Sequence, residues 1–334
     1  MAEALLSLGL DVGTTTTQLI LSRLQVQNLA NAFSVPKMQI TQREILYESP
    51  VYFTPLLDES HVDGAAIRRI VEAQYRSAGI TREQVDTGAI IITGETSRKE
   101  NARAVLQELS GFAGDFVVAT AGPDLESILA AKGAGAVAYS EKTGKTVLHM
   151  DIGGGTSNLA LIREGKIIAT GCLNVGGRLL KFDKSGKIIY VSPVLAGLTE
   201  LQAGALPAPG QVEDIAQMLA QALEMAAGLR PKTELLDKLL TQEAATPWEI
   251  PGKAVLSFSG GVADCIRQAP KEDYGDMGAA LGKAIRQSRL CQGEYMLGQQ
   301  TIRATVIGAG SHTTQLSGST VFYRNVPFPL RNLP

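Results

Sequence analysis

The chain has 334 residues, 45% of them hydrophobic and 19% charged, so it is long and apolar enough to build two domains with buried cores. Its formal net charge is −2 and its basic residues are dispersed, which argues against nucleic acid or an anionic membrane as a partner. No apolar run approaches the roughly 18 residues of a membrane-spanning helix, and the N-terminus lacks a signal-peptide pattern. We therefore expect a cytoplasmic protein.

The first of four glycine-containing segments is DVGTTTT (11–17). It follows the apolar run LSLGL (6–10), and the alternating segment TTQLILSRL (16–24) leads out of it. A short apolar run and strict alternation both predict β-strands. The segment is therefore predicted to be a loop that joins two strands.

Helices and strands alternate over the next part of the chain. Apolar residues at helical spacing predict helices over 65–78 and 97–110, and a helix rich in small residues is predicted over 125–139. The apolar runs 89–93 and 116–119 predict strands. This alternation indicates an α/β fold.

The second glycine-containing segment, DIGGGTS (151–157), repeats the first. When residues 6–21 are placed over 148–161, Asp11 lies above Asp151, and in both copies glycine follows two residues later and threonine five residues later. Apolar and alternating runs flank this copy too. The sequence thus contains two strand–loop–strand units that are 140 residues apart.

The pattern is weaker beyond the second repeat. A strand is predicted at 167–172 and a hairpin at 184–193, and helices are predicted over 211–228 and 233–243. The apolar run 254–259 predicts a return to the sheet.

The last two glycine-containing segments are FSGGVAD (258–264) and VIGAGS (306–311). Each follows apolar residues, so we expect each to mark a sharp turn at the end of a strand. The helix predicted after the first would suit an adenosine and its α-phosphate. The final residues, PFPLRNLP, contain no closing helix, which is expected at a cut point rather than at a domain end.

A strand–loop–strand unit would bind phosphate differently from a P-loop, which places the phosphate at a helix N-terminus. Here the phosphate would meet the backbone N–H groups of a hairpin turn, which glycines let it approach, and threonine hydroxyls add donors. An aspartate beside a phosphate is useful if it holds Mg²⁺ through water or orients the attacking water. A single such loop is more often an ordinary turn; two copies in register favour a nucleotide site.

The two units suggest two similarly folded domains that close on one nucleotide from opposite sides. We expect a first domain over 1–144 and a second over 145–334, with a small insert at about 183–250. The segment after about residue 306 is expected to return to the first domain.

The order of these segments resembles the five-part nucleotide signature of the actin/Hsp70/hexokinase superfamily. The resemblance implies an actin-like α/β ATPase fold, in which two ribonuclease-H-like domains face each other across a cleft that holds ATP or ADP with Mg²⁺. It makes Asp11, Asp151 and Glu126 the candidate catalytic residues, which would hold Mg²⁺ mostly through water. The candidate nucleotide-binding residues are Gly13, Thr14, Thr15, Thr16, Gly153, Gly154, Gly155, Thr156, Ser259, Gly260, Gly261, Gly308 and Gly310. The resemblance implies that the last two lie in the second connecting helix of the signature.

Longer segments, spread over essentially the whole chain, resemble the ethanolamine ammonia-lyase reactivating factors. They include GLDVGTTTTQLILSRL (9–24), AIIITGETSRKENAR (89–103), CLNVGGRLL (172–180) and RATVIGAGSHTTQLSGSTV (303–321). The resemblance implies a weak ATPase that acts as a chaperone for the adenosylcobalamin-dependent lyase, promoting release of damaged cobalamin and its exchange for intact coenzyme. The lyase and the nucleotide are then the expected partners, in the cytoplasm and in association with a bacterial microcompartment.

Two alternatives belong to other functional classes. A small-molecule kinase of the same superfamily would need a carboxylate base for its substrate in the cleft, and no residue outside the nucleotide set stands out for that role. A filament-forming or membrane-tethered relative would need polymer contacts or an amphipathic tail, and no such tail is evident. Phosphate transfer to a soluble acceptor would favour the kinase.

Overall fold

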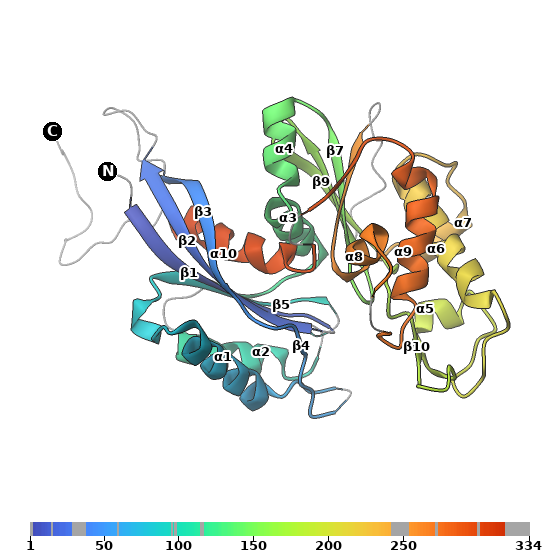
Figure 1. Cartoon of the computed structure of the whole chain (residues 1–334), viewed down its shortest axis with the longest axis horizontal. Coiled ribbons are helices and arrows are strands. Elements are labelled where there is room, and N and C mark those ends of the chain that lie inside the picture. The colour runs from blue at the N-terminus through green and yellow to red at the C-terminus, as the bar shows by residue number, and fades with distance from the viewer. Residues whose placement is uncertain are drawn as a thin grey trace, which may run out of the picture.

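Two β-sheets of the same topology form the framework of the protein (Figure 1). The computed structural model describes residues 3–14, 16–28, 38–58, 60–94, 96, 99–113, 117–241, 254–270, 273–298 and 301–317. In each sheet three consecutive strands form an antiparallel meander, and two later strands continue the sheet in parallel beside its first strand. Each repeated loop of the sequence joins the first two strands of a meander.

The first sheet has the strand order β3-β2-β1-β5-β6, and β4 pairs with β2. Its strands are β1 (Glu3–Val12), β2 (Thr16–Asn28), β3 (Met38–Glu48), β4 (Tyr52–Phe53), β5 (Thr87–Ile92) and β6 (Val117–Thr120). Its accompanying helices are α1 (Gly64–Ala78), η1 (Arg82–Gln84) and α2 (Ala102–Ala113). Leu8, Leu10 and Val12 alternate along β1, so they share one face, where they pack against Ile67 of α1 and Val105 of α2.

The second sheet has the order β13-β12-β7-β8-β9. Its strands are β7 (Val147–Ile152), β8 (Ser157–Arg163), β9 (Lys166–Leu173), β12 (Val255–Ser259) and β13 (Tyr295–Leu297). The other elements of this half are β10 (Leu180–Phe182), β11 (Ile188–Val191), α5 (Pro193–Ala196), α6 (Gln211–Ala226), α7 (Glu234–Leu239), α8 (Gly261–Arg267), α9 (Gly278–Gln287) and η3 (Arg289–Cys291). Leu148, Met150 and Ile152 of β7 form a core with α6 and α9 on one face.

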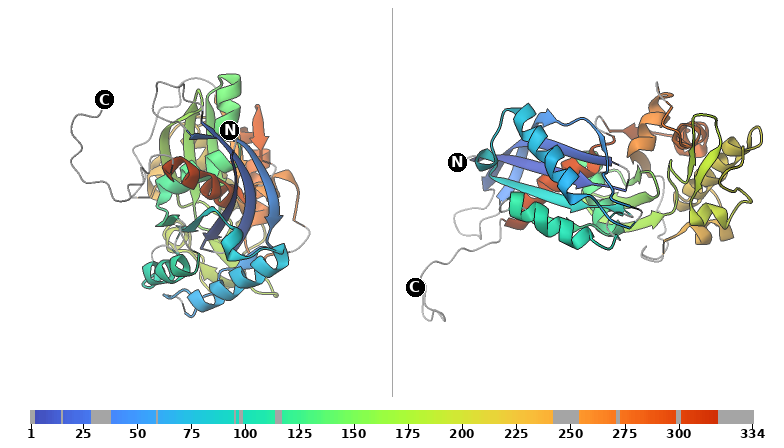
Figure 2. Two further views of the ribbon diagram at one scale, coloured as in Figure 1. Left: turned by 90° about the vertical axis from the view of Figure 1, so that its left-hand side faces the viewer. Right: turned by 90° about the horizontal axis from the view of Figure 1, so that it is seen from below.

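Two helices cross between the sheets, as Figures 1 and 2 show. They are α3 (Pro123–Gly133) and α10 (Ala304–Ser317), and the short helix α4 (Ala136–Thr143) follows α3. Leu129 of α3 packs against Ile91 of the first sheet, whereas Ala131, two residues later, packs against Val147 of the second. Helix α10 lies along α3 and covers the face of the first sheet opposite α1 and α2. The two helices are therefore the connection between the halves.

Glycines let α3 and α10 approach each other backbone to backbone. A Cβ atom added at Gly308 would overlap the carbonyl oxygen of Leu129, and one added at Gly133 would overlap that of Ala304. No side chain can be accommodated at either contact, so the spacing of the two helices depends on these glycines.

The structure confirms most of the predicted elements. Helix α1, strands β5 and β6, and helix α6 each begin and end within two residues of the predicted ranges 65–78, 89–93, 116–119 and 211–228. Among the described residues, no helix is both long enough and apolar enough to cross a lipid bilayer.

Two predicted helices are wrong in extent. The single helix predicted over 125–139 is broken into α3 and α4, because Gly135 adopts a left-handed conformation with a φ of 79°. The helix predicted from residue 97 begins at Ala102. The preceding Asn101 side chain instead pairs with the backbone N–H and C=O of Val62, both at 2.8 Å.

Two further predictions need correction. The segment 306–311 is not a turn after a strand but part of α10, and its glycines serve helix packing. The helix predicted over 233–243 ends at Leu239, because Leu240 is extended and forms a β-bridge with Leu173.

We predict that Gly308→Ala lowers the free energy of unfolding by about 2 kcal/mol or more, as expected for overpacking against a fixed backbone. Gly293→Ala is the matched control, because a Cβ atom there meets nothing within 4 Å. Urea denaturation followed by circular dichroism measures both variants. Equal stability of Gly308→Ala and wild type would show that α3 and α10 are not held at this spacing.

Candidate functional site

The two repeated loops have the same backbone geometry. The N–H of Gly13 donates to the carbonyl oxygen of Thr16 at 2.9 Å, and the N–H of Gly153 donates to that of Thr156 at the same distance. Each bond closes a tight hairpin between antiparallel strands. The alignment of the two sequence segments therefore corresponds to a structural repeat.

The carbonyl groups of the second loop are tied back by the segment after β9. The N–H groups of Gly177 and Arg178 donate to the carbonyl oxygens of Gly153 and Gly154 at 3.0 and 2.7 Å. Within the described residues, the N–H groups of Gly154 and Gly155 have no protein acceptor. Two successive free amides on a hairpin can bind the oxygen atoms of an anion.

The carbonyl group of Gly13 in the first loop is tied back in a similar way, but by side chains. It accepts hydrogen bonds from Thr54 Oγ1 at 2.7 Å and from Thr96 Oγ1 at 3.0 Å. Thr14 lies in this loop and Thr16 begins β2, whereas Thr15 lies outside the described residues.

Asp11 and Asp151 lie on the sheet faces that look towards α3 and α10. Their neighbours along the strands, Val12 and Ile152, point into the opposite cores, and strand alternation places the aspartates on the other face. Asp11 accepts a hydrogen bond from Thr93 Oγ1 at 2.9 Å. Asp151 accepts one from the Ser259 hydroxyl and a longer one, 3.4 Å, from Thr305 Oγ1 of α10.

Glu126, in the first turn of α3, brings a third carboxylate to this region. Its side chain is buried and accepts hydrogen bonds from the Gly94 N–H at 2.6 Å and from Asn158 Nδ2 at 2.7 Å. The structure therefore brings together all three predicted carboxylates, from β1, β7 and α3, close enough for their charges to interact.

The enclosure of these groups favours their protonated forms. Burial raises the pKa of Glu126 to about 8; the Gly94 hydrogen bond opposes this, and the charges of Asp11 and Asp151 add to it. Burial likewise raises the pKa of Asp11 to about 7, against the Thr93 hydrogen bond, and that of Asp151 to about 6, against the Ser259 and Thr305 hydrogen bonds. Both aspartates keep part of their surface accessible, so water or a ligand can reach them.

Each aspartate has a side-chain amide directly opposite it on the hairpin, which the sequence reasoning missed. Gln18 pairs with Asp11 and Asn158 pairs with Asp151 in the strand register. The amide oxygens of both, Gln18 Oε1 and Asn158 Oδ1, are buried without a protein partner. The signal was present in the sequence, because the amides stand seven residues after the aspartates in both copies.

The donor set fits a hydrated divalent cation. None of the three carboxylates forms an ion pair with a described lysine or arginine, and the two unpartnered amide oxygens are further neutral ligands of the kind that Mg²⁺ accepts. The described residues contain no group of three or more His, Cys, Asp or Glu side chains placed to coordinate a metal directly. Contact with Mg²⁺ through water stays a prediction.

Ser259, Gly260 and Gly261 join the end of β12 to α8. Gly260 has a φ of 86°, and a Cβ atom on it would overlap the carbonyl oxygen of Ile152, so the loop packs directly on the end of β7. The Ser259 hydroxyl donates a hydrogen bond to Asp151. This loop and the second hairpin therefore form one unit.

Gly308 and Gly310 make their contacts within the protein. Gly308 lies against Leu129 of α3, and the carbonyl oxygen of Gly310 accepts a hydrogen bond from Ser7 Oγ at 2.9 Å. The structure thus gives both glycines a packing role in the second connecting helix.

The loop after β5 also reaches the site, although the sequence reasoning used it only as a mark of resemblance. It supplies Thr93 to Asp11, the Gly94 amide to Glu126 and Thr96 to the first hairpin. Gly94 has a φ of 58°, and a side chain there would also overlap the Thr14 hydroxyl. Because β5 pairs in parallel with β1, the end of β5 lies beside Asp11, and this pairing is not visible in the sequence.

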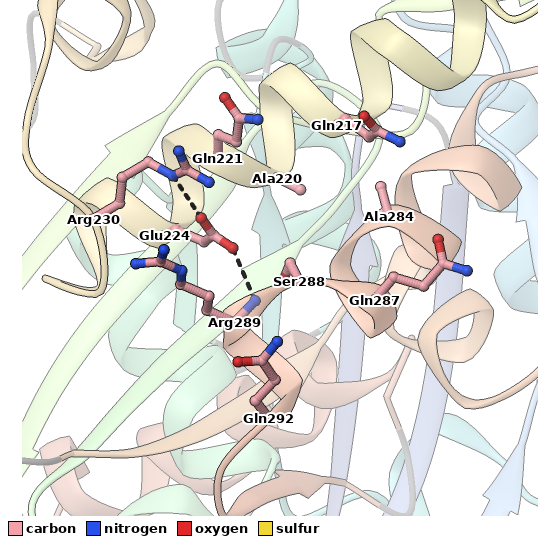
Figure 3. A pocket seen from close by; sticks show the side chains of 10 residues that line it. All are labelled: Gln217, Ala220, Gln221, Glu224, Arg230, Ala284, Gln287, Ser288, Arg289 and Gln292. Atoms are coloured by element: carbon pink, nitrogen blue, oxygen red, sulfur yellow. Dashed lines mark hydrogen bonds and ion pairs between the residues drawn. The ribbon is translucent and has the colours of Figure 1, made fainter.

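A separate cavity of about 230 Å³ lies between α6, the end of α9 and η3 (Figure 3). Glu224 lies in its wall and is fully paired, with Arg230 Nε at 2.7 Å and the Arg289 N–H at 2.8 Å. The cavity shares no residue with the hairpins, so we do not assign it to the same site.

The raised carboxyl pKa values predict that stability falls with increasing pH. A folded protein with pKa values of about 6 to 8 retains protons that an unfolded chain, with ordinary values of 3.8 and 4.5, has released. The free energy of unfolding should therefore decrease from about pH 5 to pH 8. Glu126→Gln should flatten this dependence, while Glu200→Gln, at an exposed position, should not. Melting temperatures at pH 5.5 and 8.0 without added metal test this; identical wild-type and Glu126→Gln slopes would contradict it.

Comparisons with known proteins identify the family of this chain. A model of the ethanolamine utilisation protein EutA family matches residues 3–334. The ethanolamine ammonia-lyase reactivases EutA of Salmonella typhimurium strain LT2 and Escherichia coli K12 are each 43% identical to this chain, and each alignment covers 99% of the chain and 72% of the relative.

The crystal structure of an exopolyphosphatase-like protein has a TM-score of 0.55 at 14% identity, covering 93% of this chain and 99% of that chain. At this identity the similarity concerns the fold alone. The predicted fold class, an actin-like α/β fold built from two ribonuclease-H-like halves, is confirmed. The family match over nearly the whole chain and the identity to two curated members show that this chain belongs to the EutA family of ethanolamine utilisation proteins.

Proposed function

We propose that this protein is an ATP-dependent reactivating chaperone for ethanolamine ammonia-lyase. The names of its relatives support the partner. The observation that carries the ATP-dependent part is the pair of hairpins with the same closing hydrogen bond and strand register, each with an aspartate at its base. The chaperone would promote the release of damaged cobalamin from the lyase and its exchange for intact adenosylcobalamin.

In this proposal the phosphates of ATP or ADP lie between the two hairpins. The free amides of Gly154 and Gly155 donate to phosphate oxygens from the second half, and the hydroxyl groups of the first loop donate from the other side. The adenosine lies against Gly260 and Gly261, where the chain turns sharply into α8. Gly13 with Thr16, and Gly153 with Thr156, would close the two hairpins through their backbone hydrogen bonds.

Asp11, Asp151 and Glu126 would hold Mg²⁺ mostly through water, with Gln18 and Asn158 as neutral neighbours. Mg²⁺ supplies positive charge that neutralises both the phosphates and these carboxylates. Asp11 could accept a proton from the attacking water, and Thr93, which donates a hydrogen bond to its carboxylate, would orient it for this.

The two connecting helices are well suited to transmit the state of the nucleotide. Glu126 opens α3, and Thr305 in the first turn of α10 contacts Asp151, so both helices begin at the carboxylates. Nucleotide can shift the angle between the halves only if it binds the two arrangements with different affinity. The lyase would then sense that angle.

We propose the domain division at residues 144 and 145, with 183–250 as an insert of the second domain and the segment after about 306 returning to the first. A cytoplasmic location and an association with a bacterial microcompartment rest on the family's link to ethanolamine utilisation. A small-molecule kinase remains an outcome of the tests below.

We predict that ATP and ADP with Mg²⁺ raise the melting temperature, since a ligand of the folded state stabilises it.

Asp11→Asn and Asp151→Asn should reduce Mg²⁺-dependent ATP hydrolysis by ~100-fold or more, as expected for the loss of a positioned metal or water contact. Asp237→Asn, on an exposed face of α7, serves as the control. No thermal shift with either nucleotide, in a folded sample, would remove the nucleotide proposal; wild-type turnover in both variants would leave the aspartates as turn-forming residues.

We predict that the full-length protein, given ATP, Mg²⁺ and free adenosylcobalamin, restores activity to ethanolamine ammonia-lyase inactivated with cyanocobalamin. Asp151→Asn should not restore it, because nucleotide turnover drives the change of angle. The recovery of ammonia release is the measurement. Phosphorylation of a small alcohol or acid without any recovery of the lyase would favour the kinase instead.

A further inference from the structure

A buried histidine, His149, lies beside Asp151 on β7. His149 lies two residues earlier on β7, on the same sheet face, and has no accessible surface. Its Nδ1 atom is 3.0 Å from Ser257 Oγ, and its Nε2 atom is 3.0 Å from Ser259 Oγ. Because β12 runs parallel to β7 with Ser257 opposite His149 and Ser259 opposite Asp151, the four side chains form a continuous polar row.

The chemistry of the row fixes the direction of its hydrogen bonds. The hydroxyl of Ser259 donates its single hydrogen to Asp151 Oδ1. The Ser259 oxygen is then the acceptor for His149, whose Nε2 must carry the proton. A neutral imidazole has one N–H, so Nδ1 accepts from the Ser257 hydroxyl. Every hydrogen in the row therefore points towards Asp151, and such aligned bonds strengthen one another.

Packing alone does not require an imidazole here. Val147 and Val255, at the next positions of the same face, are apolar and buried. At the equivalent position of the first sheet stands Gly9, against which Val306 of α10 packs, so the first half has no such row. A leucine would fill the volume of His149 without the cost of burying two polar atoms.

We propose that His149 is a positioning residue for Asp151, acting through Ser259. Its Nε2–H donates to the Ser259 oxygen, so that the Ser259 hydroxyl points at Asp151 Oδ1. The other carboxylate oxygen, Oδ2, then faces Thr305. The inference rests on the proposed function, because Asp151 is assigned its role there. Since Ser259 directly precedes Gly260, the row also ties the proposed adenosine loop to the carboxylate.

The kinetic test compares His149→Leu with His149→Gln. Leucine removes the donor, and kcat for ATP hydrolysis should fall ~10-fold or more, as for other groups that orient a metal-binding residue. The KM for ATP should change less than about threefold, since the loss concerns the transition state. Glutamine can present an N–H near the position of Nε2 and should recover most of kcat. Met150→Leu, a volume-conserving change on the opposite face of β7, is the control.

A second measurement does not depend on nucleotide. NMR of the protein with ¹⁵N-labelled histidine should show His149 as the Nε2–H tautomer, with a slowly exchanging ring proton. Its resonance should be missing in His149→Leu and shifted in Ser259→Ala. Melting curves of each variant confirm that the protein is folded.

The outcomes separate the two proposals. Wild-type kcat in His149→Leu, or an Nδ1–H tautomer, would overturn the positioning role while the proposed function stood. A wild-type protein that neither binds nor hydrolyses ATP would overturn the proposed function and, with it, the kinetic role of His149. The tautomer of His149 would still show in which direction the hydrogen bonds of the row are donated.

Discussion

Three carboxylates enclosed in one region, none of them in an ion pair with a lysine or arginine of the described part of the chain, are the constraint on which the rest of the site depends. Burial disfavours the charged form of each carboxylate and so raises its pKa, and the charges of neighbouring carboxylates add to this for Asp11 and Glu126. The fold stabilises them with neutral donors from several elements: Thr93, Gly94, Asn158, Ser259 and Thr305. In the proposed function, a cation bound near these carboxylates would stabilise their charged forms.

The same carboxylates explain the placement of the connecting helices. Glu126 must reach Asn158 of the second hairpin from the first turn of α3, and Thr305 must reach Asp151 from the first turn of α10. Both contacts require the helices to cross at short range, and the glycines at 133 and 308 permit it. Chemistry at the hairpins and packing between the helices are therefore two parts of one arrangement.

The sequence predicted the elements whose signals are local. The repeated hairpins, β5, α1 and α6 follow from runs of apolar residues, and the three carboxylates follow from the repeat and the resemblance. It could not predict contacts that depend on pairing between distant strands: the His149 row exists because β12 lies beside β7, more than a hundred residues away. The break of the 125–139 helix at Gly135 was missed because a single glycine is also tolerated inside a helix. The apolar residues before Gly308 predicted a turn, and only the resemblance placed Gly308 in a helix, because the sequence does not show what packs against a glycine.

The return of α10 to the first sheet has a consequence for how the chain is made. The hydroxyl of Ser7 donates to the carbonyl oxygen of Gly310, a separation of 303 residues, and Ile20 is buried beneath Val306 and Ile307. A ribosome delivers β1 (Glu3–Val12) long before α10 (Ala304–Ser317), so this face of the first sheet stays uncovered while the whole second sheet is synthesised. Pairings that must wait for distant residues are slow and leave apolar surface exposed. The nascent first half is thus the stage at which this protein most needs protection from aggregation.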